Sequence, residues 1–251
     1  MGDYTQGLEG RVALVTGAAQ RIGAEIVRTL HGQGMRVALH YRRSREPAEA
    51  LAAELNGTRP DSVALFQADL LAVGRADRLV EKVLAAWGRI DVLVNNASSF
   101  YPTSIGCVTD EGWEDLIGTN LKVPFFLAQA AAPYLRLARG CIVNLADVHG
   151  LKPLTEHTVY SVAKAGLIML TRALAAELGP EVRVNAVAPG AILWPEQGHD
   201  EVTRQRILSR TALKRQGTPA DVARAVLFLV RDADYITGQI LPVDGGRSVV
   251  G

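Results

Sequence analysis

Short apolar runs and longer helical segments alternate along almost the whole of this sequence. The apolar runs have the length of fully buried strands, and most of them end in Gly, Asn, Asp or Pro: Val12–Val15, Val37–Tyr41, Val63–Gln67, Val92–Asn95, Ile142–Leu145, Val182–Val187 and Ile240–Val243. Helical periodicity marks the stretches between them: Ala24–His31, Pro47–Leu55, Ala76–Trp87, Leu116–Leu137, Val159–Leu178 and Ala220–Val230. Because parallel strands need crossover connections, this order predicts a doubly wound, seven-stranded parallel sheet with helices on both faces.

The chain has 251 residues, which one α/β domain can fill, and it contains no Pro/Gly/Ser-rich linker and no repeat. Hydrophobic residues make up 48% of it and aromatic residues only 6%, a balance that suits the aliphatic core of a parallel sheet. We therefore expect residues 1–251 to form a single, Rossmann-like α/β domain.

One segment, Ile192–Arg215, does not fit this alternation, because it is polar and contains Trp194, Pro195, Gly198 and His199. Segments that leave the carboxyl ends of parallel strands border the ligand crevice of such a sheet. We interpret the segment as a substrate-covering loop with helices, and a plain surface excursion is the alternative.

The charge of the chain is nearly balanced, with 27 basic and 26 acidic residues, so a net charge of +1 gives no basic surface for nucleic acid or an anionic membrane. Cys107 and Cys141 form neither a disulfide framework nor a metal-ligand pattern, and we expect both to be buried or half-buried. No stretch approaches the ~18 consecutive apolar residues of a membrane span, and Met1–Gly10 has no apolar run of signal-peptide length. These observations predict a cytoplasmic protein without a metal.

A turn of small residues, Thr16–Gly23, follows the first strand and opens a helix. Small residues let the backbone turn tightly and approach a pyrophosphate at the positive end of the helix. In this strand-turn-helix context the turn predicts a dinucleotide site that includes Gly17, Arg21, Ile22 and Gly23, and a merely structural turn is the alternative.

The end of the second strand is basic, and no acidic residue occurs there before Glu46. An enzyme that uses NAD usually places an acid near this point to bind the ribose 2′-hydroxyl. Guanidinium and hydroxyl groups would instead bind a 2′-phosphate through charge-assisted hydrogen bonds. The sequence therefore predicts NADPH/NADP+ at His40, Tyr41, Arg42, Arg43 and Ser44, and a solvated basic turn is the alternative.

Tyr160 and Lys164 stand four residues apart in a helical segment, so their side chains share one face. A phenol alone titrates near 10 and is a poor acid-base catalyst at neutral pH. We expect the lysine one turn away to lower the pKa of Tyr160 toward the working range. Such a pair often arises by chance, and it becomes informative only beside the glycine turn and the basic strand end.

From about Gly10 to Gly246 the chain resembles the short-chain dehydrogenase/reductase superfamily, whose motifs occur here in order: Thr16–Gly23, Asp69, Asn95-Asn96-Ala97, Asn120, Tyr160 with Lys164, Pro189-Gly190 and Asp244-Gly245-Gly246. The resemblance implies that Tyr160 is the proton donor, that Lys164 binds the nicotinamide ribose and that Asn120 holds a water in a proton relay. It also implies that Asp69 contacts the adenine. Further cofactor contacts are implied at Leu70, Asn96, Ala97, Ser98, Pro189 and Gly190.

Two positions depart from the superfamily pattern. Arg21 replaces the middle glycine of the first turn, and Asp147 replaces the serine that usually stands thirteen residues before the tyrosine. Reduction of a ketone develops negative charge on oxygen, which a hydroxyl stabilises and an ionised carboxylate repels. Reduction of a C=N bond passes through an iminium-like species, which a carboxylate favours. Asp147 thus favours an imine-type substrate, although a protonated Asp147 could still donate to an oxyanion.

The same departures resemble the pteridine reductases, which share Thr16–Arg21, His40–Ser44, Asn95–Thr103 and Asp147 with this chain. This resemblance implies that Phe100 stacks on a pterin and that Ser98 and Arg21 contact both the pterin and a cofactor phosphate. The residues alone favour Phe100 as a core side chain. Related enzymes usually form tetramers, and the segments Leu116–Leu137 and Val159–Leu178 are apolar on more than one side, so we expect a homotetramer.

Two activities are consistent with these patterns. The first is an NADPH-dependent pteridine reductase that reduces C=N bonds of dihydrobiopterin, dihydromonapterin or dihydrofolate, with Tyr160, Lys164 and Asp147 as catalytic residues. The second is a carbonyl or alcohol oxidoreductase of the same fold, which would act on an oxoacyl thioester or a sugar. A non-enzymatic NADP sensor is disfavoured, because such a protein would have lost Tyr160 or Lys164.

Overall fold

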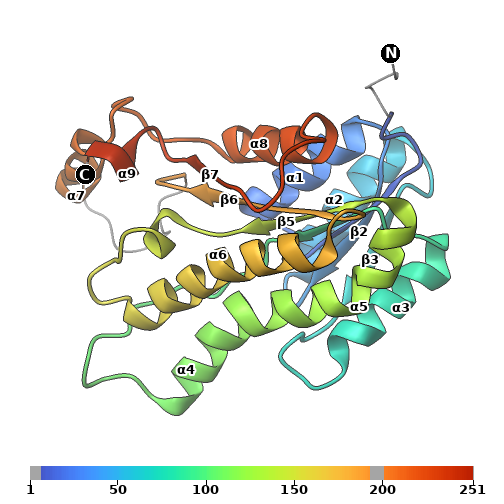
Figure 1. The fold of residues 1–251 in the computed structure, drawn as a ribbon. Helices are drawn as coiled ribbons and strands as arrows, with labels where there is room; N and C mark the ends of the chain where they lie inside the picture. The colour runs from blue at the N-terminus through green and yellow to red at the C-terminus, as the bar shows by residue number, and fades with distance from the viewer. Residues whose placement is uncertain (1–6, 193–200, 251) are drawn as a thin grey trace.

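The computed structural model describes residues 7–192 and 201–250. Its centre is a parallel seven-stranded sheet in the order β3-β2-β1-β4-β5-β6-β7, which confirms the predicted fold class (Figure 1). The strands are β1 (Val12–Val15), β2 (Arg36–Tyr41), β3 (Val63–Gln67), β4 (Val92–Asn95), β5 (Cys141–Leu145), β6 (Arg183–Pro189) and β7 (Ile240–Val243).

The helices cover both faces of this sheet. They are α1 (Arg21–Gly32), α2 (Arg45–Thr58), α3 (Arg75–Trp87), α4 (Asp110–Ile117), α5 (Val123–Ala138), α6 (Thr158–Leu178), α7 (Glu201–Ser209), α8 (Pro219–Arg231) and α9 (Arg247–Val250). A π-helical turn, η1 (Gly118–Lys122), joins α4 to α5, and a 3₁₀ turn, η2 (Val148–Gly150), follows β5. The helix predicted at 116–137 is therefore one part of a longer helical rod. α7 lies within the segment 192–215, for which helices were expected without bounds, and α9 was not predicted.

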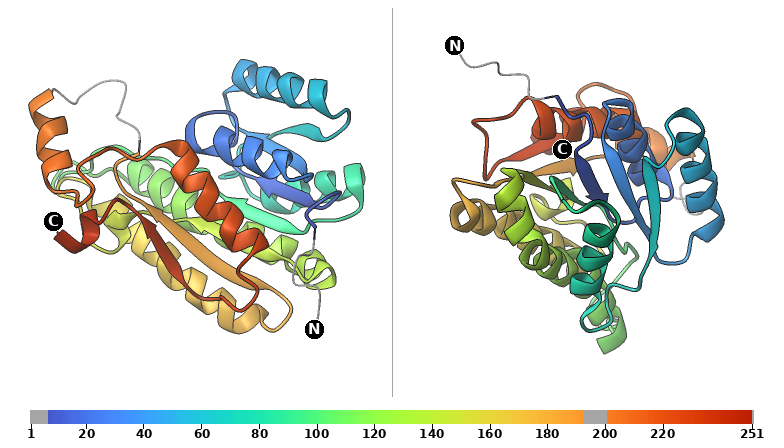
Figure 2. Two further views of the ribbon diagram at one scale, coloured as in Figure 1. Left: turned by 90° about the horizontal axis from the view of Figure 1, so that it is seen from above. Right: turned by 90° about the vertical axis from the view of Figure 1, so that its right-hand side faces the viewer.

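The two faces of the sheet have separate cores. Ala13 and Val15 of β1 pack with α1, α2 and α8, whereas Val12 and Leu14 pack with α3, α5 and α6. Figure 1 shows α1 and α8 above the sheet and α5 and α6 below it, and Figure 2 shows the same layers from two further sides. Because each strand residue faces one apolar layer or the other, the strands read as continuous apolar runs. Burial of each large aliphatic side chain contributes roughly 1.5–3 kcal/mol.

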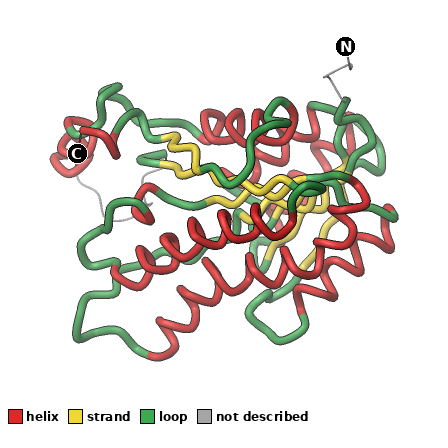
Figure 3. Tube along the Cα trace, in the orientation of Figure 1, coloured by secondary structure: helices red, strands yellow, loops and turns green. Residues whose placement is uncertain are grey.

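The carboxyl ends of all seven strands lie at one edge of the sheet, and the strand order reverses there between β1 and β4. In an open α/β sheet this switch point is where ligands bind. The loops that leave this edge, drawn in green in Figure 3, surround a cleft of about 1200 Å³. The fold thus assembles a binding site from segments that are far apart in the sequence.

One helix, α6, is long and apolar enough to cross a membrane by length and composition alone. More than half of its most apolar window is buried inside the fold, and Leu167, Leu174 and Leu178 pack within it. A buried core helix can have the same length and apolar composition, so these two properties are weak evidence for a membrane span.

The two cysteines differ in their surroundings. Cys141 is buried as predicted, whereas Cys107 is exposed, so the prediction for Cys107 was wrong. Cys107 lies in the loop that precedes α4, where Ile105 is also exposed. This loop runs over the surface of the protein, so its apolar side chains are not packed in a hydrophobic core.

Candidate active site

The glycine turn after β1 permits close backbone contacts that a side chain would block. Gly17 has a φ of +59°, and a Cβ at this position would lie 2.8 Å from the Cα of Ala97. A Cβ on Gly23 would lie 2.4 Å from the carbonyl oxygen of Gly17. Arg21, which replaces the middle glycine of the superfamily turn, has a φ of +56°. An arginine therefore holds a left-handed backbone conformation that favours glycine.

The turn is tied to the end of β4 by two polar side chains. The Thr16 hydroxyl accepts hydrogen bonds from the backbone N–H groups of Asn96 and Ala97, each at 3.0 Å. The side-chain amide of Asn96 donates to the carbonyls of Thr16 and Gly17, each at 2.9 Å. Thr16 and Asn96 thus hold the turn after β1 against the segment that follows β4, and these two segments border the cleft at the switch point.

His40, which the sequence placed among the cofactor contacts, is buried beneath the turn. Its Nδ1 accepts from the backbone N–H of Gly17 at 3.3 Å, and its Nε2 lies 3.1 Å from the carbonyl oxygen of Ala68. A neutral ring with the proton on Nε2 satisfies both bonds. Burial lowers the pKa of His40 to about 4, so the ring stays neutral and joins the turn to the end of β3.

The basic end of β2 lies on the same side of the cleft. Arg42, Arg43 and Ser44 line the cleft, with Arg43 exposed and Arg42 in a long ion pair with Asp115 at 3.9 Å. Among the described residues, no ion pair forms at Arg43. An exposed guanidinium and a hydroxyl thus line this end of the cleft, where they can bind an anionic group.

Tyr160 forms its hydrogen bond with Asp147. The phenol donates to Oδ2 of Asp147 at 2.8 Å, and the other carboxylate oxygen accepts from the backbone N–H of His149 at 2.8 Å. Burial of the tyrosine and the negative charge of Asp147 raise the pKa of Tyr160 well above its usual value. The expected lowering of this pKa by Lys164 was wrong, because the phenol is bonded to a carboxylate. Tyr160 therefore keeps its proton and can donate it.

Lys164 is buried behind the tyrosine. Its Nζ donates to the carbonyl of Leu145 at 2.8 Å and lies 5.6 Å from the ring centroid of Tyr160. Burial lowers the pKa of Lys164 to about 8, and the charge of Asp147 opposes this shift. The ammonium group therefore changes its protonation close to neutral pH.

Asn120 lies in the π-helical turn behind the cleft. Its amide nitrogen donates to the carbonyls of Ser99 and Leu116, each at 2.9 Å, and its oxygen accepts from the Ser98 hydroxyl at 2.6 Å. The side-chain amide thus has both hydrogens engaged, and its oxygen accepts one bond. The relay water that the family resemblance implies at Asn120 would bind a carbonyl oxygen of this residue as a donor, and it stays a prediction.

Phe100 lies at the mouth of the cleft with half of its surface exposed, so its interpretation as a core residue was wrong. Its ring stacks on His157 with centroids 4.7 Å apart and meets the edge of Tyr160 at 4.8 Å. It follows β4 in the loop before α4, and its ring therefore lies beside Tyr160.

The cleft contains nearly all of the site residues that the sequence predicts. Lining residues among them are Gly17, Arg21, Ile22, Gly23, His40, Tyr41, Arg42, Arg43, Ser44, Asp69, Leu70, Asn96, Ala97, Ser98, Phe100, Asp147, Tyr160, Lys164, Pro189 and Gly190. Asn120 is the exception. One carboxylate oxygen of Asp69 already accepts a hydrogen bond from the backbone N–H of Leu71, at 3.1 Å.

Sequence reasoning missed several residues that also line the cleft: His149, His157, Arg206, Arg210 and Arg247. His157 stands three residues before Tyr160, so helical spacing could have indicated it. Arg206 and Arg210 belong to the segment 192–215, and its described residues Ile192, Thr203 and Ile207 also line the cleft. That the segment covers a substrate stays a prediction, and Trp194, Pro195, Gly198 and His199 lie outside the described residues.

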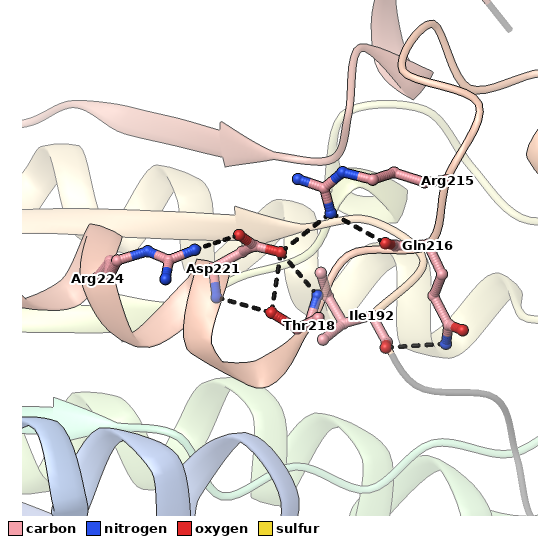
Figure 4. Close-up of polar contacts among 6 residues, drawn as sticks. All are labelled: Ile192, Arg215, Gln216, Thr218, Asp221 and Arg224. Atoms are coloured by element: carbon pink, nitrogen blue, oxygen red, sulfur yellow. Dashed lines mark hydrogen bonds and ion pairs between the residues drawn. The ribbon is translucent and has the colours of Figure 1, made fainter.

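The described ends of this segment are anchored to the fold, as Figure 4 shows. The side-chain amide of Gln216 donates to the carbonyl of Ile192 at 2.9 Å. A capping box of Thr218 and Asp221 begins α8, and Asp221 also pairs with Arg215 at 3.3 Å and Arg224 at 2.5 Å. These contacts fix the points where the segment leaves β6 and enters α8.

Comparison with known proteins gives a family for this architecture. A family model described as enoyl-(acyl carrier protein) reductase matches residues 17–248. The chain belongs to the short-chain dehydrogenase/reductase family. It is 38% identical to pteridine reductase 1 of Leishmania tarentolae, over 95% of this chain and 96% of that protein.

Two other relatives carry a different name. The chain is 39% identical to a 3-oxoacyl-[acyl-carrier-protein] reductase of Thermotoga maritima, over 95% of this chain and 98% of that one. It is 38% identical to the enzyme of the same name from Staphylococcus aureus, over 93% and 96%. The chain is thus an oxidoreductase of this family, and overall identity does not separate a pterin from an oxoacyl substrate.

Proposed function

We propose that this enzyme is an NADPH-dependent pteridine reductase that reduces a C=N bond of a dihydropterin to the tetrahydro form. The observation that carries the proposal is the hydrogen bond of 2.8 Å from Tyr160 to Asp147. A carboxylate in this position favours a substrate that becomes positively charged as it reacts. A substrate that becomes an oxyanion would be repelled.

The residues of the cleft fit a dinucleotide with a 2′-phosphate. Gly17 and Gly23 let the turn pack closely against Ala97 and itself, and the turn leads to the start of α1, where a pyrophosphate would bind. Arg43 and Ser44 would hold the 2′-phosphate, and Lys164 would hold the nicotinamide ribose. The bound cofactor supplies a hydride, and the protein supplies the proton and the geometry.

Reduction of a C=N bond requires a proton at nitrogen as well as a hydride at carbon. Tyr160 holds that proton, since the neighbouring carboxylate raises the pKa of the phenol. Asp147 stabilises positive charge on the substrate nitrogen while the proton moves from the Tyr160 oxygen toward it. The buried ammonium of Lys164 then lies close to the phenolate that remains.

Phe100 supports a flat, aromatic substrate. Its half-exposed ring stands at right angles to Tyr160, so a heterocycle that stacks on Phe100 brings its edge toward the phenol. Stacking of this kind contributes about 0.5–1.5 kcal/mol beyond burial. We propose further that Ser98 and Arg21 contact both the pterin and the cofactor.

A second candidate is a 3-oxoacyl thioester reductase, because two relatives of nearly equal identity carry that name. This activity needs a donor that stabilises an oxyanion. The position that would hold it is occupied by Asp147, whose oxygens already accept two hydrogen bonds. The carboxylate therefore disfavours this candidate.

The proposal is tested by kcat/KM for dihydrobiopterin, dihydromonapterin and dihydrofolate beside a ketone and an oxoacyl thioester. We expect the wild type to prefer a dihydropterin. Asp147→Ser removes the carboxylate charge and should lower kcat/KM for the pterin by about tenfold or more, while activity on ketones stays or rises. Phe100→Ala should mainly raise KM for the pterin, because stacking acts on ground and transition states alike. A wild type that prefers the ketone, or an Asp147→Ser variant that reduces the pterin faster, would contradict the proposal.

We also propose that the chain acts as a single NADP-binding domain in the cytoplasm and assembles as a homotetramer. The balanced charge of the sequence supports the absence of a nucleic-acid or membrane partner.

A further inference from the structure

Three arginines gather at the side of the cleft that borders β6 and β7. Arg206 lies on α7, Arg210 follows α7, and Arg247 opens α9. Figure 1 shows α7 and α9 beside each other at the carboxyl edge of the sheet. Arg42 and Arg43 follow β2, on the opposite side of the switch point, so the cleft has two separate basic ends.

The fold holds Arg247 in place by a specific turn. Asp244 accepts hydrogen bonds from the backbone N–H groups of Gly246 at 2.9 Å and Ser248 at 2.7 Å. Gly246 has a φ of +81°, and a Cβ at this position would lie 2.8 Å from the Cβ of Ala212. Leu213 donates its backbone N–H to the carbonyl of Gly245 at 3.0 Å. The start of α9 is thereby fastened to the segment that carries Arg210.

Within the part of the chain that the structure describes, no ion pair forms at any of the three guanidinium groups. Burial is the largest cause that lowers the pKa of Arg247; the charge of Asp147 opposes this shift, and the charge of Arg210 adds to it. The acids that line the cleft are Asp69, Asp147 and Glu156, and Asp147 is bonded to Tyr160. A cluster of like charges costs folding free energy, and an anion bound between them would offset that cost.

We propose that Arg206, Arg210 and Arg247 bind an anionic group on the side chain of the pterin, a carboxylate or a phosphate. This inference rests on the proposed function. The pterin ring would lie between Phe100 and the nicotinamide, and its side chain would extend toward α7 and α9. The enzyme then prefers a pterin that carries negative charge over a neutral one with the same ring.

The experiment compares kcat/KM for neutral dihydrobiopterin, for dihydrofolate as the carboxylate and for a dihydroneopterin phosphate as the phosphate. The variants are Arg206→Gln, Arg210→Gln, Arg247→Gln and the double variant Arg206→Gln/Arg210→Gln. The matched control is Arg78→Gln, an exposed arginine on α3 that does not line the cleft. The dissociation constant of NADPH is measured for each protein by fluorescence titration.

Each charge-assisted hydrogen bond contributes about 1.5–3 kcal/mol, so we expect each variant to lose about tenfold or more in kcat/KM for at least one anionic pterin. The loss should appear mainly in KM and shrink in high salt. Dihydrobiopterin turnover and NADPH binding should stay within about twofold of wild type. Whether the carboxylate or the phosphate substrate suffers more identifies the source of the anion.

Two outcomes would overturn the inference while leaving the proposed function intact. One is an equal loss on neutral and anionic pterins, and the other is no loss on either anionic pterin. A loss confined to NADPH binding would assign the arginines to the cofactor and also overturn it. If the wild type reduces none of the three pterins, the proposed function fails and the inference fails with it.

Discussion

Single residues decide the chemistry of this site, and their environments were harder to predict than their identities. The spacing of Tyr160 and Lys164 predicted that they share one helix face, and both line the cleft. It gave the wrong direction for the pKa of Tyr160, because sequence spacing cannot show that the ammonium is bonded to Leu145 and the phenol to Asp147. The charge that acts on a titratable group depends on which atoms touch it.

Replacement of Tyr160 by phenylalanine removes the proton donor and keeps the ring. We expect Tyr160→Phe to lower kcat by roughly 10²–10⁴-fold, the usual contribution of general acid catalysis, while NADPH binding changes little. Single-turnover kinetics and a fluorescence titration measure the two quantities. Near-normal turnover would remove the tyrosine from the mechanism and leave Asp147 with a relayed water as the donor.

Lys164 gives the reaction a pH dependence, because its pKa is lowered to about 8. Below this pH the ammonium is charged and stabilises the phenolate left by proton transfer, so kcat/KM should fall as pH rises through about 8. The stability trend has the opposite sign, because the fold penalises the charged form and this penalty disappears as the pH rises from about 8 toward the ordinary lysine value. Activity and urea denaturation, each followed from pH 6.5 to 10 (roughly the span between the ordinary His and Lys pKa values), measure both trends. A Lys164→Met variant whose residual activity falls at the same pH would assign the step to another group.

Cofactor choice depends on Arg43. Loss of a charge-assisted phosphate contact costs about 1.5–3 kcal/mol, so Arg43→Ala should weaken NADPH binding by roughly 10–100-fold and NADH binding far less. The matched control is Arg45→Ala, since Arg45 is exposed, pairs with Glu49 and does not line the cleft. Equal losses for the two cofactors in a titration would argue against the 2′-phosphate contact.

At the scale of elements, the strands were predicted within two residues at every end. Each strand is buried on both faces, so its apolar run is hard to mistake. The helices were predicted less well. The break between α4 and α5 was missed because the backbone remains helical through η1 and only the hydrogen-bond pattern changes. The bounds of the short α7 could not be predicted, because its polar sequence has no apolar stripe.

The capping box that begins α8 can be tested directly. Asp221→Ala should destabilise the protein by about 1 kcal/mol, the usual value of a helix cap, and Thr218→Ala by a similar amount. The double variant should lose less free energy of unfolding than the sum of the two single variants, because the Thr218 and Asp221 side chains cap each other's backbone N–H groups. Urea denaturation of the four proteins measures this coupling, and strict additivity would contradict the reciprocal arrangement.

The same cap has a pH dependence with a definite sign. Backbone hydrogen bonding to Thr218 is the largest cause that lowers the pKa of Asp221 to about 2. The stabilisation is therefore fully present above the ordinary carboxyl value near 3.9 and is lost as the pH falls through about 2. Hydrogen exchange of α8 in Asp221→Asn should lack this acid-dependent step.

At the scale of the whole molecule, the outward faces of α5 and α6 carry exposed apolar side chains. These include Phe125, Phe126, Val162 and Met169. Large exposed apolar side chains on neighbouring helices indicate a contact surface, and closed symmetry buries such a surface economically. We expect light scattering to give about four times the monomer mass of 26.9 kDa. A mass near that of the monomer would contradict the homotetramer.

The site as a whole could be predicted only in part. The predicted residues at the ends of β1, β2, β4 and β5 all line the cleft, because parallel strands bring their carboxyl ends to one edge. Arg206, Arg210 and Arg247 were not among the predicted site residues. They come from α7, the turn that follows it and α9, and the contact between these segments depends on the turn at Asp244–Gly246 and on no local sequence pattern.

The left-handed backbone at Arg21 has a consequence for how this position tolerates change over generations. A non-glycine residue in that conformation costs about 1–2 kcal/mol, which glycine would not cost. Because we propose that Arg21 contacts the pterin and the cofactor, we expect selection for a stable fold and selection for turnover to act on codon 21 in opposite directions. In a library randomised at this codon, sorting by protease resistance should enrich glycine, whereas sorting by growth that depends on the enzyme should retain arginine. In a gene copy that is no longer needed for catalysis, this codon should drift toward glycine.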